Sequence, residues 1–179
     1  MKNILPYRGI LPTIDSSAFI APNAIITGDT KIGKNSSIWF GCVVRGDVEC
    51  IRIGDNTNIQ DNTIIHVTRA NHAANKTGDK GAPAIIGNNV TVGHAAIIHA
   101  CIIDDNAFIG MGAIVMDMAH VEEYGMLAAG AVLTPGKVIK TGQLWVGSPA
   151  KYFRNLTEIE KNYIKISADN YAELAAEYK

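Results

Sequence analysis

The sequence has 179 residues, of which 47% are hydrophobic and 18% charged, with a formal net charge of −1. This length fits one domain with a sizeable core, and the balance of 16 Lys and Arg against 17 Asp and Glu offers no basic face for nucleic acid. The sequence has neither a signal-peptide-like start nor a run of about 18 apolar residues, so it predicts a cytoplasmic protein that does not enter a membrane.

Cysteine usage argues against cross-links and against a cysteine-based metal site. Cys42, Cys50 and Cys101 are odd in number, and no two of them form a Cys-x-x-Cys motif. We therefore expect reduced thiols rather than a disulfide framework or a zinc knuckle.

An aliphatic residue recurs every six residues through most of the chain. The repeat begins at Ile14, is interrupted by residues 69–84, resumes at Ile86 and ends at Trp145. The fourth residue of a unit is often a type that tolerates positive φ at a sharp corner. These corner residues are Asn23, Asp29, Asn35, Asn56, Asn62, Asn89, Asn106, Gly112, Gly130, Gly136 and Gly142. The fifth residue is commonly small, which suits an inward position beside the aliphatic side chain.

A six-residue unit of strand and corner that stacks on itself is typical of a parallel β-helix, in which three units form one triangular coil. Stacked coils pair edge to edge at about 4.8 Å. A β-sandwich is the alternative, but its turns would fall every 8 to 12 residues or so, roughly twice the period seen here. The sequence therefore predicts an all-β solenoid over residues 14–150, with an N-terminal segment 1–13 and a corner loop at 69–84.

The pattern changes to helical spacing after residue 150. Thr157 and Glu160 form a capping-box sequence. Apolar residues then recur at Ile164, Tyr171, Leu174 and Tyr178. We expect the segment 151–179 to form a C-terminal helix of about twenty residues, which packs along the solenoid and covers apolar surface.

Counting repeat units places three of the five histidines. If the unit of His66 lies on face one of the coil, the next two units, which begin at Ile86 and Val92, occupy faces two and three. The unit of His99 then returns to face one. His66 and His99 are both the second residue of their units, so they share one outward column with backbones about 4.8 Å apart. Both side chains can reach one metal ion.

His94 belongs to a face-three unit, so its side chain leaves a different face of the coil. It is up to about 16 Å of chain away from His99 at the rise of a β-strand. A cyclic trimer would bring them together, because a heterologous interface sets face one of one subunit against face three of the next. The count therefore predicts a metal site of His66, His94 and His99 that is shared between subunits of a homotrimer.

The same columns carry further groups that suit a subunit interface. Arg45 precedes His66 by one coil, and Asp61 precedes His94 by one coil. We therefore expect an ion pair between Arg45 and Asp61 across the interface. The apolar residues that we expect in the interface core are Met116, Phe40 and Met111.

Three other candidate residues lie outside this arrangement. His72 falls in the corner loop and His120 at the end of a unit, and we expect both to be structural or solvated. Cys101 is at the corner after His99 and is a weaker candidate ligand.

Several short segments occur in a recognisable order along the chain. They are SIWFGCVVRGD at 37–47, NIQD at 58–61, His66, GH at 93–94, His99, GMGAIV at 110–115 and GSPAK at 147–151. Together they resemble the gamma-class carbonic anhydrases over essentially the whole sequence. The resemblance implies a left-handed winding of the β-helix and a homotrimer with zinc at its three interfaces.

The resemblance also implies roles for individual residues. The implied metal ligands are His66, His94 and His99. The implied interface and site-ordering residues are Arg45, Asp47 and Asp61. The implied polar groups beside the metal-bound solvent are Gln60 and Asn58. Of these two, Gln60 would orient the nucleophile.

The function implied is zinc-dependent, reversible hydration of CO2 to bicarbonate. Zinc held by neutral imidazoles lowers the pKa of bound water to about 7, and the hydroxide so formed attacks CO2. Iron(II) is the alternative metal, because imidazole suits both ions. The sequence departs from the best-studied family members in lacking a glutamate proton carrier, since residues 67–84 contain Asp79 and no Glu. His72 is a candidate carrier because imidazole titrates near neutral pH.

Two other functions stay open on the sequence alone. A hexapeptide acyltransferase would take a CoA or carrier-protein donor in the groove between subunits, but it needs one histidine as general base and gives the Arg45–Asp61 pair no role. A noncatalytic trimeric scaffold or metal-binding homologue would keep the site without turnover. Metal content separates the first alternative from the hydratase, and CO2 hydration separates the second.

Overall fold

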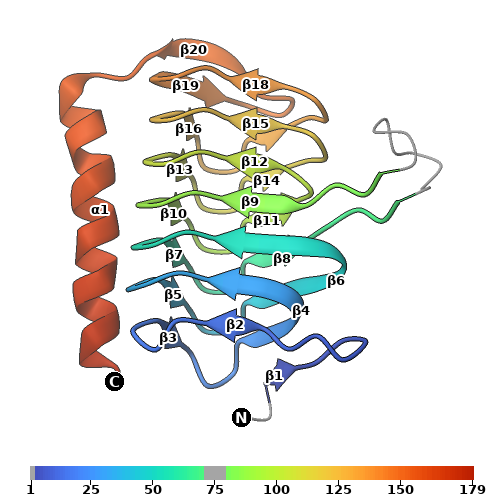
Figure 1. Ribbon diagram of the computed structural model, residues 1–179. Coiled ribbons are helices and arrows are strands. Elements are labelled where there is room, and N and C mark those ends of the chain that lie inside the picture. Colours follow the sequence, from blue (N-terminus) through green and yellow to red (C-terminus); the bar gives the residue numbers. More distant parts are fainter. Residues whose placement is uncertain (1–2, 71–79) are drawn as a thin grey trace.

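The computed structural model describes residues 3–70 and 80–179. This part of the chain forms a triangular stack of parallel coils with one helix running alongside (Figure 1). The arrangement confirms the left-handed parallel β-helix with a C-terminal α-helix that the sequence predicts. The expected corner loop 69–84 lies partly outside the described residues, and so does His72.

Each coil contributes strands to three faces of the triangle. Face one contains β1 (Ile4–Leu5), β8 (Ile64–His66), β11 (Ile97–His99), β14 (Ile114–Val115) and β17 (Val132–Leu133). Face two contains β2 (Thr13–Ile14), β9 (Ala84–Ile86), β12 (Ile102–Ile103), β15 (His120–Val121) and β18 (Val138–Ile139). Face three contains β3 (Phe19–Ile20), β5 (Ser37–Ile38), β7 (Asn58–Ile59), β10 (Thr91–Val92), β13 (Phe108–Ile109), β16 (Met126–Leu127), β19 (Gln143–Val146) and β20 (Lys151–Asn155).

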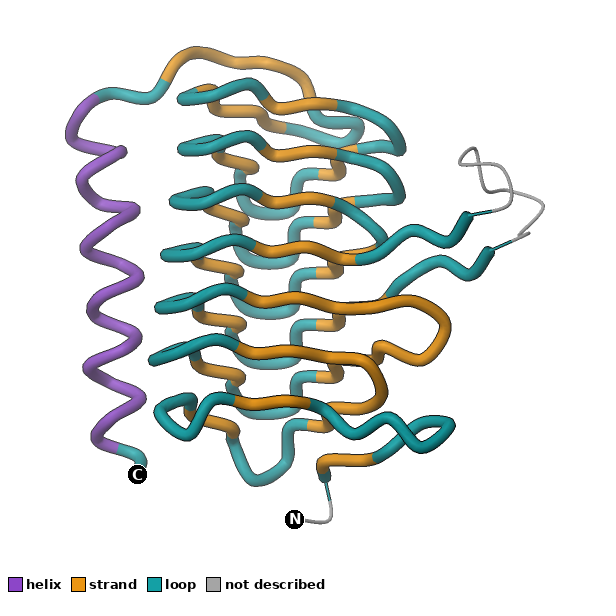
Figure 2. The backbone as a smooth tube through the Cα atoms, in the orientation of Figure 1, coloured by secondary structure: helices purple, strands orange, loops and turns teal. Residues whose placement is uncertain are grey.

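Two long strands join faces one and two. β4 (Ile25–Ile32) and β6 (Val43–Ile53) begin on face one and continue around the corner, so that β6 pairs with β8 on face one and with β9 on face two. Faces one and two therefore form one twelve-stranded sheet, and face three forms an eight-stranded sheet (Figure 2). β1 pairs with β4, so part of the expected N-terminal segment 1–13 also belongs to face one.

The register of the coils agrees with the six-residue count. His99 pairs with His66 where β11 lies beside β8. Val92 pairs with Ile59 where β10 lies beside β7. The long interruption after face one therefore spans a corner without shifting the faces, and His66 and His99 lie in one column as predicted.

The corners use left-handed backbone conformations, as the pattern of Asn and Gly predicts. Positive φ occurs at Asn35, Asn56, Asn62, Asn89, Asn106, Gly112, Gly130, Gly136 and Gly142. Two predicted corner residues, Asn23 and Asp29, lack positive φ. Asp29 lies inside β4, which rounds the corner as a continuous strand, and Gly28 takes the positive φ instead.

The coil interior is a stack of aliphatic side chains with small residues beside them. The largest fully buried side chains are Ile26, Ile38, Ile51, Ile59, Ile65, Ile86, Ile98, Ile103, Ile109, Leu127, Leu133 and Ile139. Small inward residues are buried as well, at Ala24, Thr57, Thr63, Ala96, Ala107, Ala113 and Ala131. Each coil buries its apolar positions against its neighbours, so the stack as a whole forms one continuous core.

Helix α1 (Glu158–Glu177) begins at the predicted capping box. Thr157 Oγ1 accepts the backbone N–H of Glu160, and the Glu160 carboxylate accepts the backbone N–H of Thr157. The helix packs against β5, β7 and β10 of face three and buries Ile164 and Ala168. Within the described residues, no helix has the length and apolar character needed to cross a membrane.

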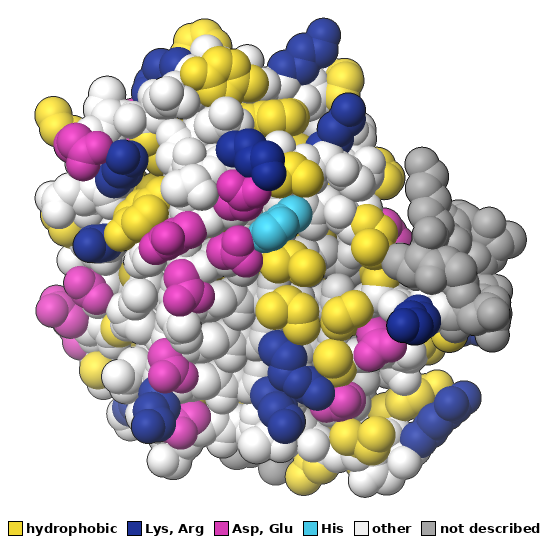
Figure 3. Space-filling model, turned by 45° about the horizontal axis from the view of Figure 1, so that its top comes forward, with side chains coloured by type: hydrophobic (Ala, Val, Ile, Leu, Met, Phe, Trp, Pro, Cys, Tyr) yellow, Lys and Arg dark blue, Asp and Glu magenta, His cyan; other side chains and the backbone are white. Residues whose placement is uncertain are grey.

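The segment 151–179 does not begin as a helix. Residues 151–155 form β20, which runs antiparallel to β19 at the end of the solenoid. A strand in this place covers the edge that the last coil would otherwise leave unpaired. Acidic and basic side chains are interspersed on the face of the molecule shown in Figure 3, in keeping with the near-zero net charge.

The stacked core makes a prediction for Leu133, whose side chain is fully buried in the coil interior. We expect Leu133→Ala to lower the free energy of unfolding by about 2–5 kcal/mol, because it leaves a cavity in the stack. Val138 of β18 is half-buried and points outward on face two, so Val138→Ala is the matched control and should cost well under half as much. Urea unfolding followed by tryptophan fluorescence measures both. Equal losses would contradict the inward placement of Leu133.

Candidate metal centre

His66 and His99 lie side by side on face one, where they end β8 and β11. His66 Nδ1 is 3.2 Å from His99 Nε2, and the two ring centroids are 5.2 Å apart. Two nitrogen ligands of a tetrahedral zinc ion, each about 2.05 Å from the metal, lie about 3.3 Å apart. The pair therefore has the separation that two ligands of one ion need.

A carboxylate lies behind each of these rings. Asp47 Oδ1 is 3.0 Å from His66 Nε2, and Asp117 Oδ1 is 2.6 Å from His99 Nδ1. Thr68 Oγ1 donates a hydrogen bond of 2.5 Å to Asp117 Oδ2 and so orients that carboxylate in turn. Carboxylates in this position fix the orientation and tautomer of an imidazole, which leaves the two facing nitrogens for a ligand.

Burial and these contacts also set the charges of the site. Burial lowers the pKa of His66 despite the nearby Asp47. Burial acts to raise the pKa of Asp47, but hydrogen bonds from His66 and Arg45 outweigh it, so that this pKa lies below its usual value. Hydrogen bonds outweigh burial in Asp117 in the same way and lower its pKa. A neutral imidazole beside an ionised carboxylate is the state that binds a metal ion.

His94 lies apart from this pair, at the corner after β10. Its Nδ1 is 2.8 Å from Asp61 Oδ2, and 43% of its side chain is exposed. Its other ring nitrogen, Nε2, faces away from Asp61 and is left for a ligand. Within the described part of the chain, no three His, Cys, Asp or Glu side chains converge on one metal position. One chain thus offers His66 and His99 together and His94 separately.

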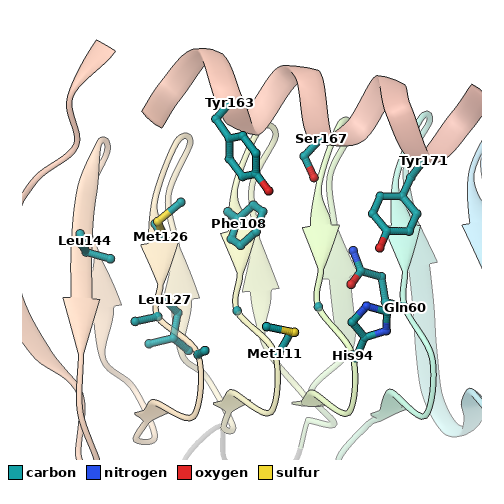
Figure 4. Close-up of a pocket in the computed structure, with 14 residues that line it drawn as sticks. Gln60, His94, Phe108, Met111, Met126, Leu127, Leu144, Tyr163, Ser167 and Tyr171 are labelled. Carbon is teal, nitrogen blue, oxygen red and sulfur yellow. The ribbon is translucent and has the colours of Figure 1, made fainter. Parts of the chain in front are cut away.

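Gln60 and Asn58 project from face three beneath α1. Gln60 Nε2 donates a hydrogen bond of 3.0 Å to Asn58 Oδ1, and the two residues are 5% and 1% exposed. Gln60 and His94 line one end of a groove of about 470 Å³ between α1 and face three (Figure 4). Apolar residues line the rest of its floor, among them Phe108, Met111, Met126, Leu127 and Leu144.

The two paired histidines of face one line a separate hollow. His66 and His99 border a space of about 380 Å³ together with Arg45, Asp47 and Asp117. The predicted site residues of one chain are therefore divided between two hollows. One holds a pair of imidazoles with their carboxylates, and the other holds a single imidazole with a polar amide.

Arg45 and Asp61 contact other residues within the chain. The Arg45 guanidinium donates to Asp47, whereas Asp61 contacts His94. The predicted ion pair between Arg45 and Asp61 therefore requires a second subunit. Because α1 packs on β5, β7 and β10, another subunit would reach face three mainly at the corners that follow these strands, where Asp61 and His94 lie.

The residues expected in the interface core differ in how far they are covered. Met111 is 58% exposed at the corner after face three. Met116 is half-buried. Phe40 packs on Tyr178 of the C-terminal segment, with ring centroids 5.8 Å apart, so the chain itself covers part of this side chain.

His120 and Cys101 are outside the two hollows. His120 Nε2 is 2.7 Å from Asp104 Oδ2 on face two, a contact that fits the structural role we expect. Burial raises the pKa of the Cys101 thiol to about 12, which keeps it protonated and makes it a poor metal ligand. All three cysteines are free thiols, as predicted.

Asp117 is the site residue that the sequence reading missed. It lies at the corner one coil beyond His99, and its backbone oxygen accepts the N–H of Gly136 in the next coil. The sequence does show a carboxylate at this corner, in the coil that follows the column of Arg45, His66 and His99, and this carboxylate could have been considered. Whether such a side chain turns toward the column depends on its rotamer, which the repeat does not specify.

Comparison with known proteins bears on the family. Residues 12–46 match the family described as "Bacterial transferase hexapeptide (six repeats)". The chain is 49% identical over 164 residues to gamma carbonic anhydrase 2, mitochondrial, of Arabidopsis thaliana, a match that covers 92% of this chain and 57% of the plant protein. It is 43% identical over 176 residues to the carbonic anhydrase of Geobacillus kaustophilus, covering 98% of this chain and 91% of the bacterial protein. The chain belongs to the gamma carbonic anhydrase family.

A solved structure shares the fold along the whole chain. A solved hexapeptide transferase family protein from Anaplasma phagocytophilum is 50% identical and superimposes with a TM-score of 0.91, covering 100% of both chains. The chain spans less than two thirds of the length of its plant gamma carbonic anhydrase relative, at 57%.

The contact between Asp117 and His99 makes a prediction for metal affinity. We expect Asp117→Ala to weaken zinc binding about 10–100-fold, because the His99 ring loses the group that orients it. Competition with a chromophoric chelator measures the affinity. Asp104→Ala is the matched control, since it removes the carboxylate behind His120 on face two and should leave zinc affinity unchanged. Equal effects of the two substitutions would contradict a specific role for Asp117.

Proposed function

We propose that this protein hydrates CO2 reversibly to bicarbonate, with zinc held by His66, His94 and His99 at the interfaces of a homotrimer. The observation that carries the proposal is the 3.2 Å separation of the facing nitrogens of His66 and His99, with His94 left on another side of the chain. The similarity to proteins named carbonic anhydrase supports the reaction. Iron(II) is the alternative metal.

The donor set fits such an ion. Each of the three imidazoles has a carboxylate on its far nitrogen, provided by Asp47, Asp61 and Asp117. The ion, when bound, supplies Lewis acidity that makes water nucleophilic near neutral pH. Gln60, at the end of the groove beside His94, would hold that water by a hydrogen bond. The apolar floor of the groove suits CO2, a small neutral molecule, better than it suits an ion.

A trimer would join the two hollows into one site. Aliphatic side chains stand exposed on face one beside the histidine pair, with Ile25, Ile64 and Ile97 at 41%, 44% and 38% exposure. The half-buried Val43 lies between Ile25 and Ile64 and completes an apolar column. An exposed apolar patch of this kind is typical of an interaction surface. In this assembly Arg45 of one subunit would pair with Asp61 of the next, as the sequence predicts.

Metal content and CO2 hydration, measured on one preparation, test the proposed function. We expect as many zinc ions as chains, hydration that stops on chelation, and recovery when zinc is restored. Protein that binds no metal and transfers an acyl group from CoA would support the acyltransferase alternative instead. Stoichiometric zinc without hydration would support a noncatalytic homologue.

Mixing of two inactive variants tests the shared site. His66→Ala and His94→Ala should each abolish zinc binding alone. When their trimers are dissociated, mixed in equal amounts and reassembled, about a quarter of the interfaces should receive an intact pair from one variant and an intact His94 from the other. Zinc content and hydration should return to that extent.

A matched mixture provides the control. His66→Ala and His99→Ala both damage face one, so no interface in their mixture receives a complete ligand set. This mixture should therefore stay free of zinc. Recovery in both mixtures, or in neither, would show that the ligands are not divided between subunits in this way.

A further inference from the structure

Polar residues interrupt an apolar column beneath α1. The outward column of face three contains, coil by coil, Phe19, Ser37, Asn58, Thr91, Phe108, Met126 and Leu144. Both ends of this column are apolar, as expected for a surface that a helix covers. The three positions between Phe19 and Phe108 are polar, although each is only 1% exposed. Burying a polar side chain is unfavourable unless it is hydrogen-bonded, so these positions call for a physical reason.

A chain of hydrogen bonds leads from α1 through Thr91 and Asn58 to Gln60, whereas Ser37 Oγ accepts a hydrogen bond from Trp39 Nε1 outside this chain. Ser167 Oγ of α1 is 3.1 Å from Thr91 Oγ1. Thr91 Oγ1 accepts a hydrogen bond of 3.0 Å from Asn58 Nδ2. Asn58 Oδ1 then accepts a hydrogen bond of 3.0 Å from Gln60 Nε2. Among the described residues, no buried side-chain nitrogen or oxygen lacks a partner, so the chain is satisfied throughout.

The donor–acceptor direction of this hydrogen-bond chain determines which way the Gln60 amide faces. The backbone oxygen of Val90, which can only accept, is 3.4 Å from Asn58 Nδ2 and keeps the amide nitrogen of Asn58 on that side. Thr91 has a single hydroxyl hydrogen, and when it is donated to Ser167 the Thr91 oxygen must accept from Asn58. Asn58 therefore presents its oxygen to Gln60. Gln60 donates to it through Nε2, which leaves Oε1 for the groove.

We propose that Ser167 and Thr91 are positioning residues that orient the side-chain amide of Gln60, so that Oε1 faces the groove beside His94. This inference rests on the proposed function for its chemical meaning, since an acceptor there holds a water molecule by its O–H. A reversed amide would present an N–H donor in its place. Figure 4 shows Ser167 on α1 facing the face-three strands, with Gln60 and His94 below it at the end of the groove.

Helix α1 would therefore have two roles. The helix covers face three, and through Ser167 it also supplies the far end of the hydrogen-bond chain. Without the Ser167 hydroxyl, the Thr91 hydrogen is free to turn toward Asn58, and only the long 3.4 Å contact of Asn58 Nδ2 with the Val90 oxygen still opposes reversal of the two amides. This role accounts for the polar residues Asn58 and Thr91 in the column, which connect Ser167 to Gln60.

Side-chain NMR of the metal-free protein tests the orientation directly. The sequence contains two glutamines, Gln60 and Gln143, so labelling with 15N-glutamine yields two side-chain amide groups and an internal reference. In the unaltered protein, one Nε2 hydrogen of Gln60 should exchange slowly with water. Ser167→Ala and Thr91→Val should each speed that exchange about fivefold or more, as expected for loss of one hydrogen bond, and leave the Gln143 signals unchanged.

Two control variants separate orientation from loosening of the helix. Thr91→Ser keeps the hydroxyl and should retain the slow exchange that Thr91→Val loses. Ile164→Val removes one methylene from the buried face of α1, away from the hydrogen-bond chain, and should leave Gln60 exchange unchanged. Unchanged exchange in both Ser167→Ala and Thr91→Val, or equal acceleration in Ile164→Val, would overturn the proposal.

Kinetics on zinc-loaded protein tests the consequence. We expect Ser167→Ala to lower kcat for CO2 hydration about tenfold at unchanged zinc content, because the nucleophilic water loses its alignment. A reversed Gln60 amide with unchanged kcat would overturn the positioning role. Absence of hydration in the unaltered protein would instead count against the proposed function, and the exchange experiment would still decide how Gln60 is held.

Discussion

The site depends on one parallel pairing, that of β8 with β11, which sets His99 directly over His66. The pairing places the two side chains next to each other, with their facing ring nitrogens 3.2 Å apart. A shift of one residue in either strand would turn one of the imidazoles into the coil interior, where aliphatic side chains are stacked. The buried residues Ile65 and Ile98, which precede the histidines, prevent such a shift because each must stay inside.

The six-residue period explains how much of this arrangement is predictable from the sequence. A strict repeat specifies which residues point inward and which share an outward column, so the pairing of His66 with His99 and the separate place of His94 follow from counting. The conformation of most corners follows as well, because Asn and Gly mark them. Counting fails at Asp29, because β4 runs on around the corner and the positive φ falls one residue earlier, on Gly28.

Counting does not predict the features that depend on tertiary packing and on side-chain rotamers. The repeat does not say which face α1 covers, and the helix in fact occupies face three, so that a neighbouring subunit can meet this face mainly at its corners. The contacts of Asp117 and Arg45 depend on side-chain rotamers. The Arg45 guanidinium contacts Asp47 of its own chain and not Asp61. Asn58 and Thr91 are visible in the sequence as outward polar residues, but their connection to α1 is seen only in the structure, where Ser167 lies against Thr91.

The carboxylates alone do not identify the histidines as a metal centre. His66, His94, His99 and His120 all have an aspartate on one ring nitrogen, so a His–Asp contact by itself marks no site. Three of these pairs are distinguished by where the opposite nitrogen faces. Those of His66 and His99 face each other, and that of His94 lies beside a hydrogen-bonded amide at the end of an apolar groove.

A general base for acyl transfer would use one such imidazole and would gain nothing from a second ring in contact with it. Carboxylates behind the two facing imidazoles instead offset the charge of a divalent cation bound there, and Asp47 and Asp117 are already oriented by hydrogen bonds from Arg45 and Thr68. The arrangement therefore makes electrostatic sense with a cation present. Under the proposed function, His94 of a second copy of the chain would complete the ligand set, because face one and the corner after β10 point in different directions.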